Sequence, residues 1–193
     1  DCGASVCFCA TDDIARTVRG LQTELPQLKL VVSFDAPASD AGSFQALLAK
    51  GAGQNTPVAS VAEDDIAAYI YTSGTTGNPK GVVLTHKNLA YNVSAILDEF
   101  PVITCEFRSL SFLPWAHAFG QTAELHTLLG VGASLGICEG VPKIIDNLAE
   151  VKPSILMAVP NIFNRIYDGV QKQMTAKPAI IQSIFRTGMA AQS

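Results

Sequence analysis

A glycine- and hydroxyl-rich stretch from Tyr71 to Val82 constrains this chain more than any other part of its sequence. It follows an apolar run, 66–71, whose length suits a buried strand, and it precedes Thr85, which is placed to begin a helix. A strand, a glycine-rich loop and a helix form the arrangement in which backbone N–H groups and a helix N-terminus bind phosphate. The candidate phosphate-binding residues are Thr72, Ser73, Gly74, Thr75, Thr76, Gly77 and Lys80.

The stretch does not match the GxxxxGK[ST] phosphate loop, because Lys80 follows a proline and precedes a glycine. A solvated surface loop is the alternative. Against it, the residues from Tyr71 to Val82 resemble the signature loop of the adenylate-forming enzymes. That superfamily includes acyl-CoA synthetases, luciferases and the adenylation domains of peptide synthetases. The resemblance implies ATP as a substrate, and it implies that Thr72 helps to hold Mg²⁺. Lys80 adds a mobile positive charge, and we expect it to act mainly by steering the polyphosphate.

The composition narrows the classes of partner. Of the 193 residues, 48% are hydrophobic and 16% charged, which fits an α/β interior with buried parallel strands. The net charge of −4 argues against nucleic acid as the main partner. No apolar run approaches the ~20 residues of a transmembrane helix. The five cysteines include no CxxC pair, so neither a disulfide framework nor a zinc site is indicated, and a reducing cytoplasm is the expected compartment.

Strand and helix patterns alternate along most of the chain. A strand at 5–10, an amphipathic helix at 12–25 and a strand at 28–34 predict a βαβ unit with a parallel pair. Later helical patterns alternate with short strands, including one at 154–159. The alternation predicts an α/β fold in which parallel sheets are covered by helices on both faces. We expect residues 1–62 to form a partial βαβ unit with a connector, and residues 63–193 to carry the phosphate loop and the acyl pocket of the same large domain.

A second informative stretch runs from Leu113 to Gly120. It places a histidine and two aromatic residues after a strand, at the end of a parallel sheet where ligands usually bind. A lone histidine is more often structural, but this stretch resembles the LPxxHxxG motif of acyl-CoA synthetases. The resemblance implies that the motif borders an acyl and adenylate pocket. The candidate pocket residues are Trp115, His117, Phe119 and Gly120. His126 lies out of phase with His117 on a helix, which argues against a metal pair.

The segment Glu150–Tyr167 resembles the long-chain fatty acyl-CoA synthetases, although Asn161 stands where that branch often has arginine. The implied function is part of an ATP-dependent fatty acyl-CoA synthetase, which uses ATP, Mg²⁺ and CoA and passes through an acyl-adenylate. The alternatives are a non-catalytic nucleotide- or acyl-binding module, or a ligase for an aryl or amino acid.

Several parts that the resemblance requires are absent from the 193 residues. They are a later Tyr-Gly-x-Thr-Glu motif, a ribose-binding aspartate and a C-terminal domain with its lysine. We therefore expect an internal fragment of the large N-terminal domain that is inactive alone. Self-association of the fragment and peripheral membrane contact of the parent protein are left open.

Overall fold

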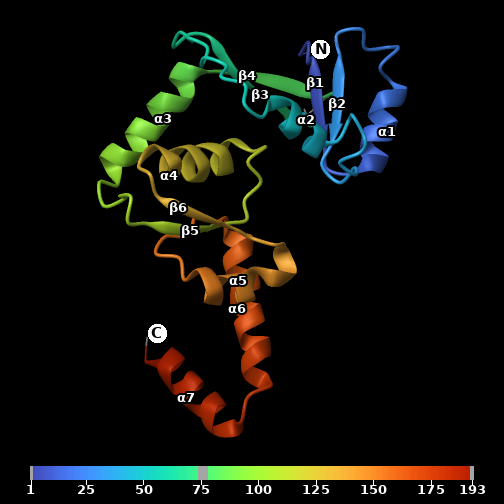
Figure 1. The fold of residues 1–193 in the computed structure, drawn as a ribbon. Helices are drawn as coiled ribbons and strands as arrows, with labels where there is room; N and C mark the ends of the chain where they lie inside the picture. The colour runs from blue at the N-terminus through green and yellow to red at the C-terminus, as the bar shows by residue number, and fades with distance from the viewer. Residues whose placement is uncertain (1, 74–77, 192–193) are drawn as a thin grey trace. The chain divides into compact units, whose positions relative to one another are not determined.

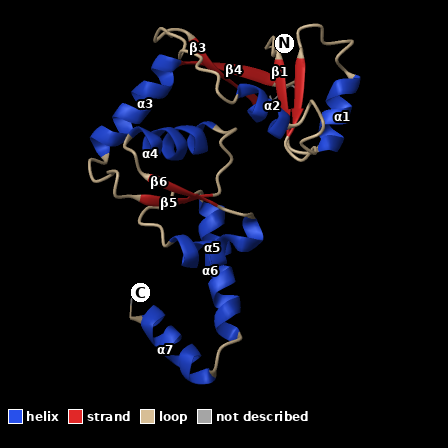
Figure 2. Cartoon of the chain, in the orientation of Figure 1, coloured by secondary structure: helices blue, strands red, loops and turns tan. Residues whose placement is uncertain are grey.

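The structure is a computed structural model that describes residues 2–73 and 78–191. The chain divides into two compact units, Asp1–Val61 and Ala62–Ser193, and each is considered by itself. Each unit combines strands and helices (Figures 1 and 2), and the expected α/β class is confirmed. The sequence analysis assigns residues 1–62 and 63–193 to two parts of one large domain, and this assignment stays a prediction.

The first unit is built on a parallel βαβ element. β1 (Val6–Cys9) pairs with β2 (Leu30–Ser33), and α1 (Asp12–Gly20) connects the two strands. A parallel pair cannot be joined by a tight turn, so the helical crossover follows from the strand pairing. α2 (Phe44–Gly51) comes after β2, and the hydroxyl of Ser43 caps it by accepting a hydrogen bond from a backbone N–H of the first turn.

The core of this unit consists of Cys9, Ala15, Leu28 and Val31. Because side chains alternate along a strand, Cys7 points to the same side of β1 as Cys9, and their Sγ atoms lie 3.8 Å apart. Burial raises the pKa of the Cys9 thiol, and the contact with Cys7 adds to the effect. Cys9 therefore acts as a small apolar core residue, as the strand pattern predicts.

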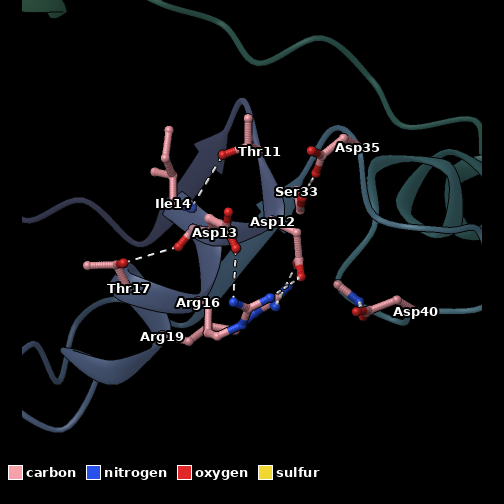
Figure 3. Close-up of polar contacts among 11 residues, drawn as sticks. Thr11, Asp12, Asp13, Ile14, Arg16, Thr17, Arg19, Ser33, Asp35 and Asp40 are labelled. Atoms are coloured by element: carbon pink, nitrogen blue, oxygen red, sulfur yellow. Dashed lines mark hydrogen bonds and ion pairs between the residues drawn. The ribbon is translucent and has the colours of Figure 1, made fainter.

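The start of α1 carries a small charged network (Figure 3). Thr11 caps the helix, and the guanidinium of Arg16 lies 3.2 Å from Asp12 and 2.9 Å from Asp13. Two acidic residues in the first turn interact favourably with the helix dipole. Since these side chains are exposed, the ion pairs add little stability, and the cap and the apolar face hold the helix in place.

The second unit begins with a β-hairpin. β3 (Ile66–Thr72) pairs with β4 (Lys80–Thr85) in antiparallel fashion, and α3 (His86–Glu99) follows directly. The sequence predicts that Lys80, Gly81 and Val82 belong to the loop, and that prediction is wrong because they begin β4. The β-branched Val82 and Val83 favour an extended chain, and the backbone of 80–85 finds its hydrogen-bond partners in β3.

A parallel pair forms the centre of the second unit. β5 (Arg108–Ser111) pairs with β6 (Ser134–Ile137), and the connection contains a π-helix, η1 (Gly120–His126), that continues into α4 (Thr127–Gly130). In Figure 1, α4 lies on one side of the β5–β6 pair and α5 (Ile144–Val151) on the other. This part of the fold therefore has the helix-covered parallel strands that the alternating pattern predicts.

The remainder of the unit is mostly helical. A short 3₁₀ turn, η2 (Val141–Lys143), leads into α5, and α6 (Pro160–Thr175) and α7 (Ala179–Ala190) complete the chain. The strand predicted at 154–159 is reduced to one bridge between Ile155 and Ser109 of β5, and α6 begins at Pro160 directly after this segment. Among residues 2–73 and 78–191, no helix has the length and apolar character needed to cross a bilayer.

Leu128 is the centre of the second unit's core, and its side chain is 0% exposed. We expect Leu128→Ala to lower the free energy of unfolding by about 3 kcal/mol, because the mutation removes buried methyl groups and leaves a cavity. Leu129 is the matched control, since it is the next residue of the same helix and is 59% exposed. Leu129→Ala should cost less than about 0.5 kcal/mol. Denaturant unfolding of both variants checks this; equal losses would contradict the assigned core.

Candidate functional site

The loop end of the β3–β4 hairpin brings two groups of predicted phosphate contacts together. Thr72, the last residue of β3, lies opposite Lys80, the first residue of β4. Ser73 follows Thr72, and all three side chains are exposed. A hydroxyl pair and an ammonium group therefore stand at one end of a rigid hairpin, available to an anion. The predicted contacts Gly74, Thr75, Thr76 and Gly77 lie outside the described residues.

The N-terminus of α3 does not offer free backbone N–H groups to an anion at this site. Thr85 and Asn88 form a capping box in which the Asn88 N–H donates to Thr85 Oγ1 and the Thr85 N–H donates to Asn88 Oδ1. The N–H groups of His86 and Lys87 donate to the backbone carbonyls of Asp65 and Glu63. The first amides of the helix are thus already paired, and β4 separates them from the loop. The predicted strand–loop–helix phosphate cradle is replaced by a hairpin.

The stretch after β5 forms a tight turn. The indole N–H of Trp115 donates to Ser111 Oγ at 3.1 Å, and the backbone N–H of His117 donates to the Pro114 carbonyl at 3.0 Å. The imidazole of His117 is exposed. Gly120 is buried against the turn, and a Cβ there would lie 2.8 Å from the Pro114 carbonyl oxygen. The π-helix can approach the turn this closely only because residue 120 has no side chain.

An apolar cavity of about 650 Å³ opens within the second unit. This volume is in the range of sites that bind small molecules. Of the four predicted pocket residues, Phe119 lines the cavity, whereas Trp115, His117 and Gly120 do not. The walls come from β4, α3, the turn before β5, the start of η1 and the segment after α5. Among the lining residues are Leu84, Leu89, Ile96, Phe107, Ala118, Ala123 and Met157.

The polar side chains that line the cavity come from α3 and η1. They are Asn88, Asn92 and Thr122. Asn88 is held by the capping box, and Asn92 Nδ2 donates to the Asn88 carbonyl at 2.9 Å. With few polar groups and many apolar ones, the cavity suits an extended hydrocarbon better than a charged ligand.

Sequence reasoning missed a buried carboxyl group beside the turn. Glu124, in η1, is 0% exposed, and its two oxygens accept hydrogen bonds from Ser109 and Ser111 of β5. The sequence signal was present: two serines alternate within a short apolar strand, and a glutamate interrupts the apolar face of a helix. The wide π turn is supported by Thr127, whose hydroxyl donates to the Thr122 carbonyl at 2.8 Å.

Metal binding by several protein side chains is not supported within the described ranges. Residues 2–73 and 78–191 contain no group of three His, Cys, Asp or Glu side chains placed to hold a metal ion. Nε2 of His126 is buried and finds no hydrogen-bond partner in that part of the chain. Mg²⁺ usually keeps water ligands and phosphate oxygens, so a single hydroxyl such as that of Thr72 is compatible with it.

Comparison with known proteins identifies the family of this chain. Residues 1–192 match the family described as AMP-binding enzyme, and the chain belongs to that family. Among proteins, it is similar to the peroxisomal long chain acyl-CoA synthetases 7 and 6 of Arabidopsis thaliana. The first is 34% identical over 174 residues, which are 84% of this chain and 25% of that protein. The second is 30% identical over 197 residues, covering 96% of this chain and 28% of that protein.

Solved structures agree with this assignment. MatB from Rhodopseudomonas palustris superposes in its apo form with a TM-score of 0.69 at 25% identity, covering 86% of this chain and 32% of MatB. The ATP-bound form gives a TM-score of 0.66 at 27% identity with the same coverage. The chain thus spans about a quarter of the length of the curated relatives and a third of the MatB chain.

The close packing at Gly120 leads to a test. We expect Gly120→Ala to destabilise the protein by about 1–3 kcal/mol, because the new methyl group would meet the Pro114 carbonyl. Gly130→Ala is the control, since its Cβ would make an ordinary contact at 3.6 Å with Val93. That variant should change stability by less than about 0.5 kcal/mol. Thermal unfolding compares the two; a neutral Gly120→Ala would show that the approach is not tight.

Proposed function

We propose that this chain is the phosphate-loop and acyl-pocket portion of an ATP-dependent long-chain fatty acyl-CoA synthetase. The overall reaction joins a fatty acid to CoA through an acyl-adenylate, with AMP and pyrophosphate as products. The observation that carries the proposal is the pairing of Thr72 with Lys80 at the loop end of the hairpin, in the unit that also holds the apolar cavity. The printed names of the relatives supply the substrate class.

The hairpin residues have a defined task in that reaction. A carboxylate attacks the α-phosphate of ATP only if the two are aligned and the charge on the departing pyrophosphate is neutralised. The Lys80 ammonium would attract the polyphosphate, and the hydroxyls of Thr72 and Ser73 would donate hydrogen bonds to its oxygens. Mg²⁺, when bound with ATP, supplies further positive charge, and Thr72 is the candidate protein ligand.

The cavity would take the acyl chain. Leu84, in the cavity wall, lies four positions after Lys80, which is roughly 14 Å along an antiparallel strand. The polar and apolar parts of the substrate thus have separate binding regions joined by β4. His117 stands on the turn beside the cavity, where an exposed imidazole would contact the carboxylate end of the acid. The cytoplasmic location, the peripheral membrane contact and the self-association stay predictions.

Lys80 provides the first functional test. If its charge steers ATP, Lys80→Ala should raise the KM for ATP about tenfold at low ionic strength, and high salt should reduce the difference. Lys87→Ala is the control, because Lys87 is an exposed lysine at the start of the following helix, 4.0 Å from Glu63. ATP–pyrophosphate exchange by the complete enzyme, with a fatty-acid mixture, gives both values. An unchanged KM in Lys80→Ala would argue against the phosphate assignment.

His117 provides a second test that separates acid from nucleotide. We expect His117→Ala to alter the KM or kcat for fatty acid several-fold, while the KM for ATP changes little, because the residue lies on the cavity side of the site. His86→Ala serves as the control, since His86 is at the start of α3, whereas His117 is on the turn that leads to Phe119 in the cavity wall. Loss of soluble protein would instead indicate that His117 is structural.

The alternatives to a fatty acid are separated in the same assay. Exchange with aryl or amino acids but not with fatty acids would assign a different ligase. ATP binding without any exchange in the complete protein would favour a non-catalytic binding module.

A further inference from the structure

The buried carboxyl group of Glu124 is the centre of a chain of hydrogen bonds that runs to the surface. Ser109 Oγ donates to Oε1 at 3.0 Å, and Ser111 Oγ donates to Oε2 at 2.6 Å. Ser111 Oγ also accepts the indole N–H of Trp115 at 3.1 Å. Ser109 is 0% exposed and Ser111 is 5% exposed, whereas the Trp115 ring is 38% exposed.

The direction of each hydrogen bond in this series is determined by which atoms can donate a proton. An indole nitrogen only donates, so Ser111 must accept from Trp115, and the single hydroxyl proton of Ser111 is left for Glu124. The carboxyl group thus orients the Ser111 hydroxyl, and the hydroxyl orients the tryptophan. Within the described ranges, none of the ion pairs includes Glu124. The two serines therefore satisfy both carboxyl oxygens, and replacing either serine would leave a buried acceptor without its partner.

Trp115, at one end of this series of hydrogen bonds, lies on the turn that leads to the cavity. Trp115 is tied back to β5 through Ser111, and His117 closes the turn by its bond to Pro114. The next residues, Ala118 and Phe119, line the cavity. Glu124 itself follows Ala123, another cavity residue, on the π-helix. The Glu124 carboxyl group is therefore connected to the cavity wall in two ways. The π-helix links it to Ala123, and its hydrogen bond to Ser111 links it through Trp115 to the turn before Ala118.

We propose that Glu124 and Ser111 are positioning residues that act through Trp115: they hold the turn that places Ala118 and Phe119 in the cavity wall and so set its affinity for the acyl chain. This inference rests on the proposed function. It assigns no contact with substrate to Glu124, which is fully buried.

The two serines make a matched pair for the test. Each donates one hydroxyl proton to Glu124, but only Ser111 also binds Trp115. In the complete enzyme, Ser111→Ala should raise the KM for fatty acid about tenfold, the size expected for one lost hydrogen bond of upper-range strength. The KM for ATP should stay within about twofold. Ser109→Ala should leave the KM for fatty acid within about twofold, although it also removes a buried hydrogen bond. Ser111→Thr, which keeps the hydroxyl, should lie nearer the wild type than Ser111→Ala.

A ¹⁹F NMR measurement reports on the environment of Trp115 directly. The complete enzyme is labelled with 5-fluorotryptophan, and the ¹⁹F resonance of Trp115 is identified by its loss in Trp115→Phe. We expect Ser111→Ala to shift this resonance and Ser109→Ala to leave it in place. If Ser111→Ala fails to fold, Trp115→Phe replaces it, because it keeps an aromatic ring and removes the indole donor; it should then raise the KM for fatty acid.

Two results would overturn the inference while the proposed function stands. One is an equal effect of Ser109→Ala and Ser111→Ala on the KM for fatty acid, which indicates a purely structural role of Glu124. The other is a Trp115 resonance that Ser111→Ala does not move. A wild-type enzyme that activates no fatty acid would instead overturn the proposed function, and this inference with it.

Discussion

The parallel pairing of β5 with β6 is the constraint on which the candidate acyl pocket depends. Parallel neighbours run in the same direction, so the chain must return across the sheet before it can start the second strand. The residues between Ser111 and Ser134 make that return, and they contain the turn with Trp115, the π-helix and α4. Leu128, at the end of this crossover, anchors it in the core. The cavity wall is thus part of a connection whose path is imposed by strand pairing.

The candidate phosphate site follows from a different constraint, the antiparallel pairing of β3 with β4. A helix N-terminus binds an anion through amides that have no partner, whereas the amides of α3 are already paired. The hairpin instead supplies side chains at a fixed spacing. Because Thr72 and Lys80 are opposite each other, the ends of the intervening segment are held at the separation of paired strands. Charge and hydroxyl groups, rather than a helix dipole, are then the main described contributions to phosphate binding.

Much of the fold could be predicted from the sequence, because its elements have strong local signals. The hydrophobic periodicity located α1, and Thr85 located the start of α3. β4 was missed because Lys80–Thr85 lies between two strong motifs, and its pairing with β3 depends on a partner that local patterns do not reveal. The strand expected at 154–159 failed for the related reason that only its first two residues, Ser154 and Ile155, form backbone hydrogen bonds to β5.

The candidate site was less predictable than the fold. The types of residue in the phosphate loop and in the LPxxHxxG-like turn pointed to their chemistry through resemblance. The contribution of Glu124 required three dimensions, because Ser109 and Ser111 lie 15 and 13 residues away from it in sequence. The distinction between Phe119, which lines the cavity, and His117, which does not, depends on how a tight turn directs successive side chains.

The π-helix also has a consequence for how this segment can change in length. Each residue of an α-helix turns the chain by about 100°, and the wider π turn accommodates an additional residue within a similar rise. A deletion of one residue between Gly120 and Glu124 could restore ordinary α-helical hydrogen bonds without disturbing Leu128. Because the wider turn absorbs that residue, the helix on either side would keep its phase, and Phe119 would keep its direction relative to that core anchor. In this segment, a one-residue deletion therefore changes the cavity wall within the turn itself, where Thr122 and Ala123 lie, while the core packing is retained.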